Sequence, residues 1–207
     1  MHVSARLALS ALLISAPLGA SAQEWFAGGS IGIGQQDDYS IGGPVTSADD
    51  TDTAYRLFGG YLVSELQGFV ASYIDLGEAS YAGPAFGGFT DRLSADGFDI
   101  AYVLGWTPGE QERVRIFGTV GVFAWDQDVV YTELGTSTAF VSKDDGTSFS
   151  LGFGADINLS ASGDNVWGIN VAYQLFKDVG DENFSGHEND RQMISAGVTY
   201  RFRRNQR

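Results

Sequence analysis

Hydrophobic residues recur at every second position over long stretches of this sequence, and this alternation constrains the fold more than any other feature. In residues 147–158, one face of an extended chain would be apolar and the other small or polar. The first face is Phe149, Leu151, Phe153, Ala155 and Ile157, and the second is Ser148, Ser150, Gly152, Gly154 and Asp156. Because successive side chains of a β-strand point to opposite faces, the segment is predicted to be a long strand.

The same alternation predicts eight strands in all. The other seven cover residues 24–34, 53–63, 68–78, 94–106, 114–127, 166–176 and 193–202. In the strand at 114–127 we assign the aliphatic residues Val114, Ile116, Val120 and Val122 to the outer face. Strands of this length exceed the roughly 5 to 6 residues of soluble sheets and suit a tilted span through a membrane.

The predicted connectors alternate between long and short along the chain. The long ones are 35–52, 79–91, 128–145 and 177–190, and the short ones are 64–67, 107–113 and 159–165. Outer-membrane barrels have an even number of strands, long extracellular loops, short periplasmic turns and both termini on the periplasmic side. We therefore expect an all-β fold, an eight-stranded antiparallel up-and-down transmembrane β-barrel.

A soluble ligand-binding barrel is the main architectural alternative. Such a barrel turns its apolar face inward and its polar face to water. The face that begins at Ser148 carries almost no charge, so it suits the crowded inside of a narrow barrel better than a wetted exterior. Aromatic residues at strand ends also suit the girdles of a membrane barrel. These residues are Trp25, Trp106, Trp167, Tyr200 and Phe202.

The N-terminal segment has the pattern of a secretory signal. Arg6 precedes an apolar run over residues 7–18, which is followed by the small residues Ala20, Ser21 and Ala22. A membrane-spanning helix needs about 20 apolar residues, so this run is too short to be an anchor. We expect Sec-type export and cleavage of a signal peptide of residues 1–22 before Gln23. A barrel domain over 23–202 and a short basic tail over 203–207 follow.

The composition excludes several classes of function. The chain has 12 Lys and Arg against 26 Asp and Glu, a net charge of −14, which argues against nucleic acid as a partner. It has no cysteine, which excludes disulfides and thiolate chemistry. Acidic residues gather in the long connectors, but without the carboxylate spacing of a calcium loop, so we expect neither a metal site nor a cofactor. They include Asp37, Asp38, Asp49, Asp50, Asp52, Asp128, Glu133, Asp144, Asp145, Asp178, Asp181, Glu182, Glu188 and Asp190.

Three segments resemble the OmpA-like transmembrane barrels. Residues 58–77 read FGGYLVSELQGFVASYIDLG and resemble the second and third strands of that family, and IFGTVGVFAW at 116–125 resembles its fifth strand. The last strand resembles the signal read by the barrel-assembly machinery, with Ser195, Gly197, Tyr200 and Phe202 at the matching positions. The resemblance implies a small barrel in the Gram-negative outer membrane, with this machinery, outer-membrane lipid and lipopolysaccharide as partners.

The sequence departs from the family pattern at two places. The family signal ends at its aromatic residue, whereas residues 203–207 follow Phe202 here. The family also has a Glu of an interior salt-bridge cluster two residues after the Gly of the third strand, where this chain has Val70. A gate built on that Glu is therefore not implied.

Charged residues on the inward faces are the candidate site. Strand parity turns Arg56, Asp99, Arg115, Asp156 and Arg201 into the barrel. Buried charges are normally paired. We therefore predict that Arg115 pairs with Asp156 and that Arg201 pairs with Glu24. These residues would plug the lumen and set the strand register, with a conducting path as the alternative.

The expected function is that of a non-enzymatic integral outer-membrane barrel. It would have a structural or surface-interaction role and display four long acidic extracellular loops, at which an unidentified extracellular ligand would bind. One alternative is a small porin-like channel through the interior. Another is a lipid A-modifying enzyme, because some barrels of this size use His with Ser and a carboxylate, and His187 has Ser185 and Glu188 nearby.

Overall fold

The computed structural model describes eight segments of the chain. They are residues 24–36, 46–64, 66–84, 88–108, 113–133, 138–159, 165–180 and 189–203. These segments contain the strands β1 (Glu24–Gln36), β2 (Ser47–Asp49), β3 (Thr51–Leu62), β4 (Gln67–Gly83), β5 (Phe89–Trp106), β6 (Val114–Glu133), β7 (Thr138–Asn158), β8 (Asn165–Val179) and β9 (Asn189–Arg203). Within these segments, no helix is long and apolar enough to cross a lipid bilayer.

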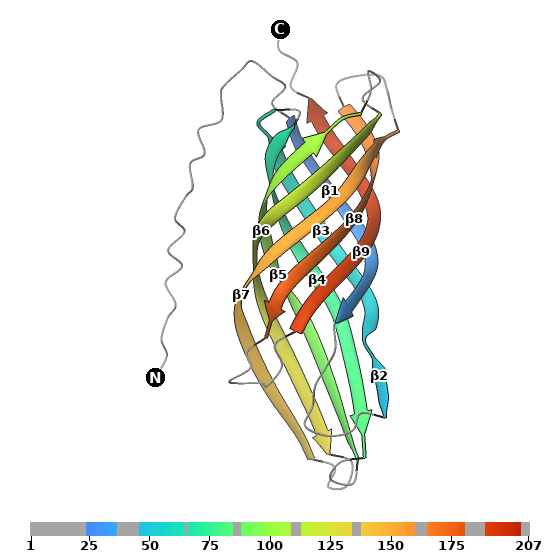
Figure 1. Cartoon of the computed structure of the whole chain (residues 1–207), viewed down its shortest axis with the longest axis vertical. Helices are drawn as coiled ribbons and strands as arrows, with labels where there is room; N and C mark the ends of the chain where they lie inside the picture. Colours follow the sequence, from blue (N-terminus) through green and yellow to red (C-terminus); the bar gives the residue numbers. More distant parts are fainter. Residues whose placement is uncertain are drawn as a thin grey trace, which may run out of the picture.

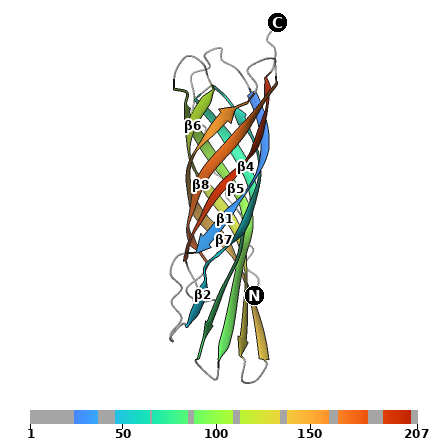
Figure 2. The same cartoon turned by 90° about the vertical axis from the view of Figure 1, so that its right-hand side faces the viewer.

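Eight of the strands close into one antiparallel barrel (Figures 1 and 2). Each pairs with its neighbours along the chain, and β1 closes the ring by pairing with both β3 and β9. β2 pairs with the far end of β4, outside the ring. The predicted all-β fold of eight antiparallel up-and-down strands is confirmed.

The strands are longer than predicted at the rim away from the chain ends. Glu24 lies opposite Arg203, so both ends of the barrel sequence are at one rim. The strand ends Leu62, Gln67, Trp106, Val114, Asn158 and Asn165 lie at the same rim. At the other rim the predicted loops 79–91 and 128–145 are largely strand, because β4 runs to Gly83, β5 starts at Phe89, β6 runs to Glu133 and β7 starts at Thr138. The alternation fades there because polar side chains occupy the outer face as well, while the backbone pairing continues.

Part of the sheet therefore stands beyond the barrel. β7 pairs with β6 from Thr138 onward but with β8 only from Ser150 onward. Residues 78–83, 89–96, 126–133 and 138–149 of β4 to β7 form this extension sheet, which reaches the lower end of the molecule in Figure 1. Gly77, with a φ of +78°, lies in the irregularity where β4 shifts register and enters it.

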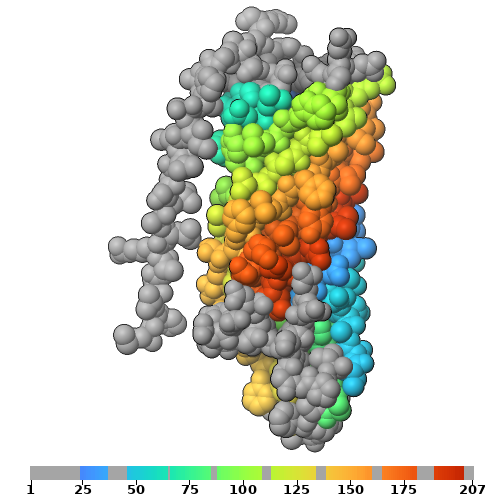
Figure 3. Space-filling model, in the orientation of Figure 1, coloured from blue at the N-terminus to red at the C-terminus, as the bar shows by residue number. Residues whose placement is uncertain are grey.

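The outer surface of the barrel is apolar. The strands cross it obliquely (Figure 3). Exposed large hydrophobic residues cover every strand of the ring, including Ile31, Leu57, Phe69, Ile100, Val122, Leu151, Ile169 and Val198. Aromatic rings pack near the rim of the chain ends, with centroids 4.8 Å apart for Trp25 and Tyr61 and 4.6 Å apart for Trp167 and Tyr200. An apolar outer surface around a lumen that holds charged residues is the reverse of a soluble barrel, and it fits a lipid environment.

Candidate functional site

All the charged residues expected inside the barrel are buried there. Arg56, Asp99, Arg115, Asp156 and Arg201 each point into the lumen, and so does Glu24 near the rim of the chain ends. Their positions follow from strand parity, because each shares a face with small or apolar buried neighbours on its own strand. The lumen therefore carries three arginines and three carboxylates in the half nearer the chain ends.

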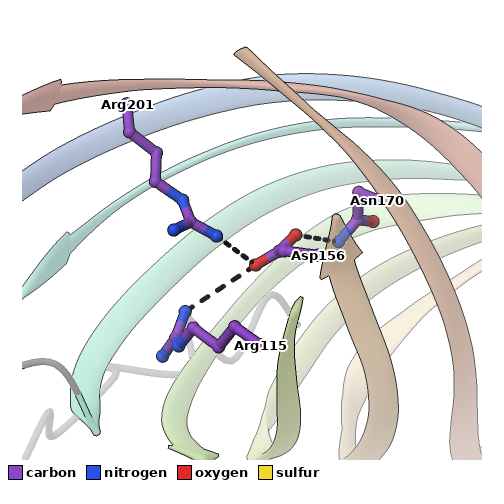
Figure 4. A network of polar contacts seen from close by, with 4 residues as sticks. All are labelled: Arg115, Asp156, Asn170 and Arg201. Carbon is purple, nitrogen blue, oxygen red and sulfur yellow. Dashed lines mark hydrogen bonds and ion pairs between the residues drawn. The ribbon is translucent and has the colours of Figure 1, made fainter. Parts of the chain in front are cut away.

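Asp156 is the centre of this network (Figure 4). Its Oδ2 accepts a hydrogen bond from Arg201 Nη2 at 3.0 Å and lies 3.8 Å from Arg115 Nη1. Its Oδ1 accepts a hydrogen bond from Asn170 Nδ2 at 2.8 Å. One carboxylate on β7 thus connects to β6 and β8, which flank it, and to β9, which lies beyond β8.

The structure places Arg115 beside Asp156, as predicted, because the two residues are direct cross-strand partners on β6 and β7. It differs from the prediction for Arg201, whose ion pair is with Asp156 and not with Glu24. The register explains this difference. Glu24 lies opposite Arg203, two positions nearer the rim than Phe26, which is the partner of Arg201. The arginine side chain instead reaches across β8 to β7.

Two further polar contacts lie in the lumen near this network. Arg56 donates from Nε and Nη2 to Ser72 Oγ, at 3.1 and 3.0 Å, and its guanidinium lies 4.7 Å from the centre of the Phe58 ring. Ser150 Oγ donates to Asp99 Oδ1 at 2.6 Å. Arg56 on β3 is therefore hydrogen-bonded to β4, and Asp99 on β5 is hydrogen-bonded to β7.

A small cavity of about 30 Å³ separates these groups. Arg56, Arg115, Arg201 and Asp156 line it with apolar side chains, among them Phe58 and Val103. Buried polar atoms around it have no protein partner, including Arg115 Nε and Nη2, Asn170 Oδ1 and Thr199 Oγ1. A water occupies roughly 10–15 Å³ of such volume, so the cavity has room for about two waters that would satisfy these atoms.

Val70 stands where the family resemblance implies a buried Glu, and the structure shows what replaces that charge. Val70 is buried against Phe58, Ala101 and Val103, with Phe26 and Phe117 packed on the same cluster. This part of the lumen is apolar. Arg115 and Arg201 pair with Asp156 at a level nearer the chain ends.

An apolar layer also crosses the lumen, further from the chain ends than the charge network. It consists of Ala54, Ile74, Leu76, Ala95, Phe123, Trp125, Phe176, Val179 and Met193, which come from six strands. The rings of Phe123 and Phe176 meet at 4.5 Å across β7, where the small side chains Ser148 and Ser150 leave room.

Sequence reasoning missed two buried charges, Arg191 and Asp91, near the far rim of the barrel. Both have the parity of the inward residues, since Arg191 precedes Met193 by two and Asp91 precedes Leu93 by two. Asp91 was assigned to a loop and Arg191 to neither a loop nor a strand, because the predicted strands 94–106 and 193–202 start too late. The alternation, followed further, would have found both.

A row of four aspartates marks the base of the extension sheet. Asp75, Asp96, Asp126 and Asp145 lie directly opposite one another on β4, β5, β6 and β7, on the outer face. Tyr73 donates a hydrogen bond from its hydroxyl to Asp96 Oδ2 at 2.8 Å. Charges here exclude the hydrocarbon of a bilayer, so the lipid-facing belt ends at this row.

Beyond the row, exposed ion pairs lie on the outer face of the extension sheet. Arg92 lies 3.7 Å from Glu78 and Lys143 lies 2.9 Å from Asp128, with all four side chains well exposed. Among the described residues, no group of three or more His, Asp and Glu is placed to hold a metal. The polar surface indicates that this sheet stands in water.

The other candidate residues divide between the described segments and the rest of the chain. Ser195 and Gly197 of the assembly signal face the lumen, whereas Phe202 is exposed on the outer surface and Tyr200 packs against the Phe202 ring at 4.5 Å. His187, Ser185 and Glu188 lie outside the described residues, as do Asp37, Asp38, Asp181 and Glu182.

Solved structures share this architecture. They include the outer membrane protein OprG of Pseudomonas aeruginosa, with a TM-score of 0.55 at 12% identity over 89% of this chain and 98% of that one. Neisserial surface protein A gives 0.53 at 12% identity, over 84% of this chain and 95% of that one. Ail, the attachment invasion locus protein of Yersinia pestis, gives 0.51 at 14% identity, over 88% and 99%. At these identities the likeness shows the fold alone.

Sequence comparison gives the family. Outer membrane protein A of Klebsiella pneumoniae is 27% identical over 86% of this chain and 51% of its own length, and that of Salmonella typhi is 26% identical over 86% and 48%. The chain thus spans about half the length of the curated relatives it matches. The model of the OmpA-like transmembrane domain matches residues 20–206. This match covers nearly the whole chain and shows that the protein, an outer-membrane β-barrel, belongs to the OmpA-like transmembrane domain family.

Proposed function

We propose that this protein is a non-enzymatic anchor with a surface-interaction role, which displays the extension sheet outside the outer membrane. The observation that carries this proposal is the length of β5, β6 and β7, which have 18, 20 and 21 residues. A tilted strand needs about 9–11 residues to span a membrane. The surplus on three neighbouring strands builds a rigid platform on which binding residues are held in fixed positions.

The charge of this platform limits its partner. The aspartate row, Asp128 and Glu78 outnumber the cations Arg92 and Lys143 on the outer face, which is therefore negative. Ail of Yersinia pestis has been solved in complex with sucrose octasulfate, a heparin analogue. A polyanion of that kind would be repelled by the acidic sheet of this chain, so we propose a neutral or basic extracellular ligand instead.

Two further partners belong to the proposal. Outer-membrane lipid and lipopolysaccharide would contact the apolar belt, and the barrel-assembly machinery would read the last strand during insertion. Sec-type export would be accompanied by removal of residues 1–22, with cleavage before Gln23. The acidic connectors would contribute to the displayed surface, although much of the predicted third loop is strand.

Truncation of the extension sheet tests the proposed role. Gln127 and Asp144 are cross-strand partners, so an Asn-Gly turn can replace residues 128–143 and join them as a hairpin. The matched control replaces only residues 134–137 with Asn-Gly, which joins the partners Glu133 and Thr138 and keeps the sheet. Attachment of bacteria that express each variant to cultured epithelial cells is the readout.

We expect attachment with the native chain and the control, and a loss to the empty-vector level with the truncation. A heat-modifiable band shift of equal intensity in outer-membrane fractions would show that all variants insert. Equal attachment of the truncated and native proteins would overturn the role of the sheet. Attachment no higher than that of the empty vector for every variant would overturn the surface-interaction role as a whole.

A further inference from the structure

Two layers lie across the lumen, one built from charged side chains and the other from apolar side chains. The first is the network around Asp156 with its polar cavity. The second is the apolar layer that contains Phe123, Phe176 and Met193. An ion that crosses the barrel has to pass both layers.

The apolar layer is densely packed. Ala54, Ile74, Phe123, Phe176 and Val179 are completely buried, and their contacts connect β3, β4, β6 and β8. On β1, Gly34 contributes no side chain, and a Cβ added there would overlap the main chain at Leu76. The backbones of β1 and β4 thus approach closely at this level, beside a cavity of about 10 Å³ that Gly34, Leu76 and Arg191 line.

The polar atoms of this layer are satisfied within the protein. Trp125 donates from Nε1 to Ser148 Oγ at 2.7 Å, and Ser148 donates in turn to the carbonyl of Asp178 at 2.9 Å. Among the described residues, none of the buried polar atoms that lack a partner belongs to Trp125 or Ser148. The side chains of the layer therefore require no water themselves, and unpartnered polar atoms next to it belong to Asp99, Gln174 and Arg191.

The charge network has the opposite property. Its cavity of about 30 Å³ lies next to unpartnered atoms of Arg115, Asn170 and Thr199, which need water. An ion there would meet water and charged groups that can rearrange around it. In the apolar layer an ion would meet mainly hydrocarbon, with Asp99 opposite Phe123 and Arg191 beside Leu76 as the charged neighbours. Apolar constrictions block conduction by excluding water.

We propose that the apolar layer, and not the charge network, is the barrier to ion passage through this barrel. The charges fix strand register in a hydrated half of the lumen, and their loss leaves the barrel closed. This inference is independent of the surface role proposed above, because no residue of the extension sheet takes part in it.

Two triple variants test the proposal. In the first, Arg115→Gln, Asp156→Asn and Arg201→Gln remove the charges at nearly constant volume. In the second, Phe123→Ser, Phe176→Ser and Met193→Ser make the apolar layer small and polar, since an enlarged apolar cavity could stay dry. Purified, refolded proteins are recorded in planar bilayers, and a heat-modifiable band shift shows which samples have folded. The single variants Phe176→Ser and Met193→Ser replace the second triple variant if it does not fold.

We expect stable, discrete single-channel steps from the variants of the apolar layer. Their frequency should be at least tenfold above the frequency of any current events recorded from the native protein. Stable steps from the native protein or from the charge variant would overturn the proposal. The absence of steps from folded variants of the apolar layer would overturn it as well, because the barrier would then lie elsewhere.

Discussion

Asp156 shows how one buried residue organises the lumen. Its two oxygens accept hydrogen bonds from Arg201 and Asn170 and attract Arg115, so a single negative charge serves two arginines. A buried ion pair is weak evidence for net stability, because desolvation opposes the attraction. Removal of one partner is different, since it leaves the remaining charges buried without compensation.

Asp156→Ala should therefore destabilise the barrel by about 3–5 kcal/mol, the usual cost of breaking a buried ion pair. Urea unfolding in lipid vesicles, followed by tryptophan fluorescence, measures the change. The control is Asp128→Ala, which removes an exposed ion pair to Lys143 and should cost at most about 1 kcal/mol. Equal effects of the two substitutions would contradict the central place of Asp156.

Strand parity was enough to predict which charged residues enter the lumen, but not which of them meet. Arg115 and Asp156 share a cross-strand position, so their contact follows from the register of two neighbouring strands. The contact of Arg201 with Asp156 spans β8 and depends on the length of the arginine side chain and on the stagger of the barrel. Pairs that are not on neighbouring strands cannot be derived from alternation alone.

At the scale of elements, inward aromatic residues have glycines as their direct cross-strand partners. Phe26 lies opposite Gly60, Phe58 opposite Gly28, Phe117 opposite Gly154 and Trp125 opposite Gly146. At each of these glycines an added Cβ would overlap the partner ring. The glycines thus provide the space that lets bulky rings lie flat inside a narrow barrel, and the pairs help to specify the register.

Gly60→Ala tests this role of glycine. The new methyl group would overlap the Phe26 ring, and overpacking of this kind should cost about 1–3 kcal/mol. Gly59→Ala is the matched control, because a Cβ there faces outward and its nearest neighbour, the Phe26 carbonyl oxygen, is 3.6 Å away. Unfolding in vesicles should separate the two variants. A loss of stability with Gly59→Ala that equals the loss with Gly60→Ala would argue against the ring contact.

The ends of the elements were harder to predict than their existence. All eight barrel strands were found because lipid on one side and a crowded lumen on the other impose strict alternation. Beyond the aspartate row both faces of β6 and β7 carry polar residues, so the pattern no longer distinguishes strand from loop, although the two strands remain paired to Glu133 and Thr138. The extension sheet and the inward residue Asp91 were missed for this one reason.

The whole molecule is a barrel with a lipid-facing belt of limited height. The belt lies between the aromatic rings near the chain ends and the row of Asp75, Asp96, Asp126 and Asp145. Like charges in directly opposed positions repel one another, and they are tolerable only in water or among headgroups. The row therefore fixes how deep the barrel sits and makes the extension sheet a protruding structure.

A charge scan across this boundary tests the placement in the membrane. Val122 is 54% exposed near the middle of the belt, and Val141 is 64% exposed on the extension sheet, in register with Val130 and, through it, with Arg92. Val122→Arg should cost about 2–4 kcal/mol of stability in vesicles, because an arginine near the bilayer midplane faces hydrocarbon. The same change at Val141 should cost close to nothing, since Arg92 already occupies that level. If both substitutions destabilised the protein equally, the sheet would not protrude; if neither did, the outer surface of the barrel would not face lipid.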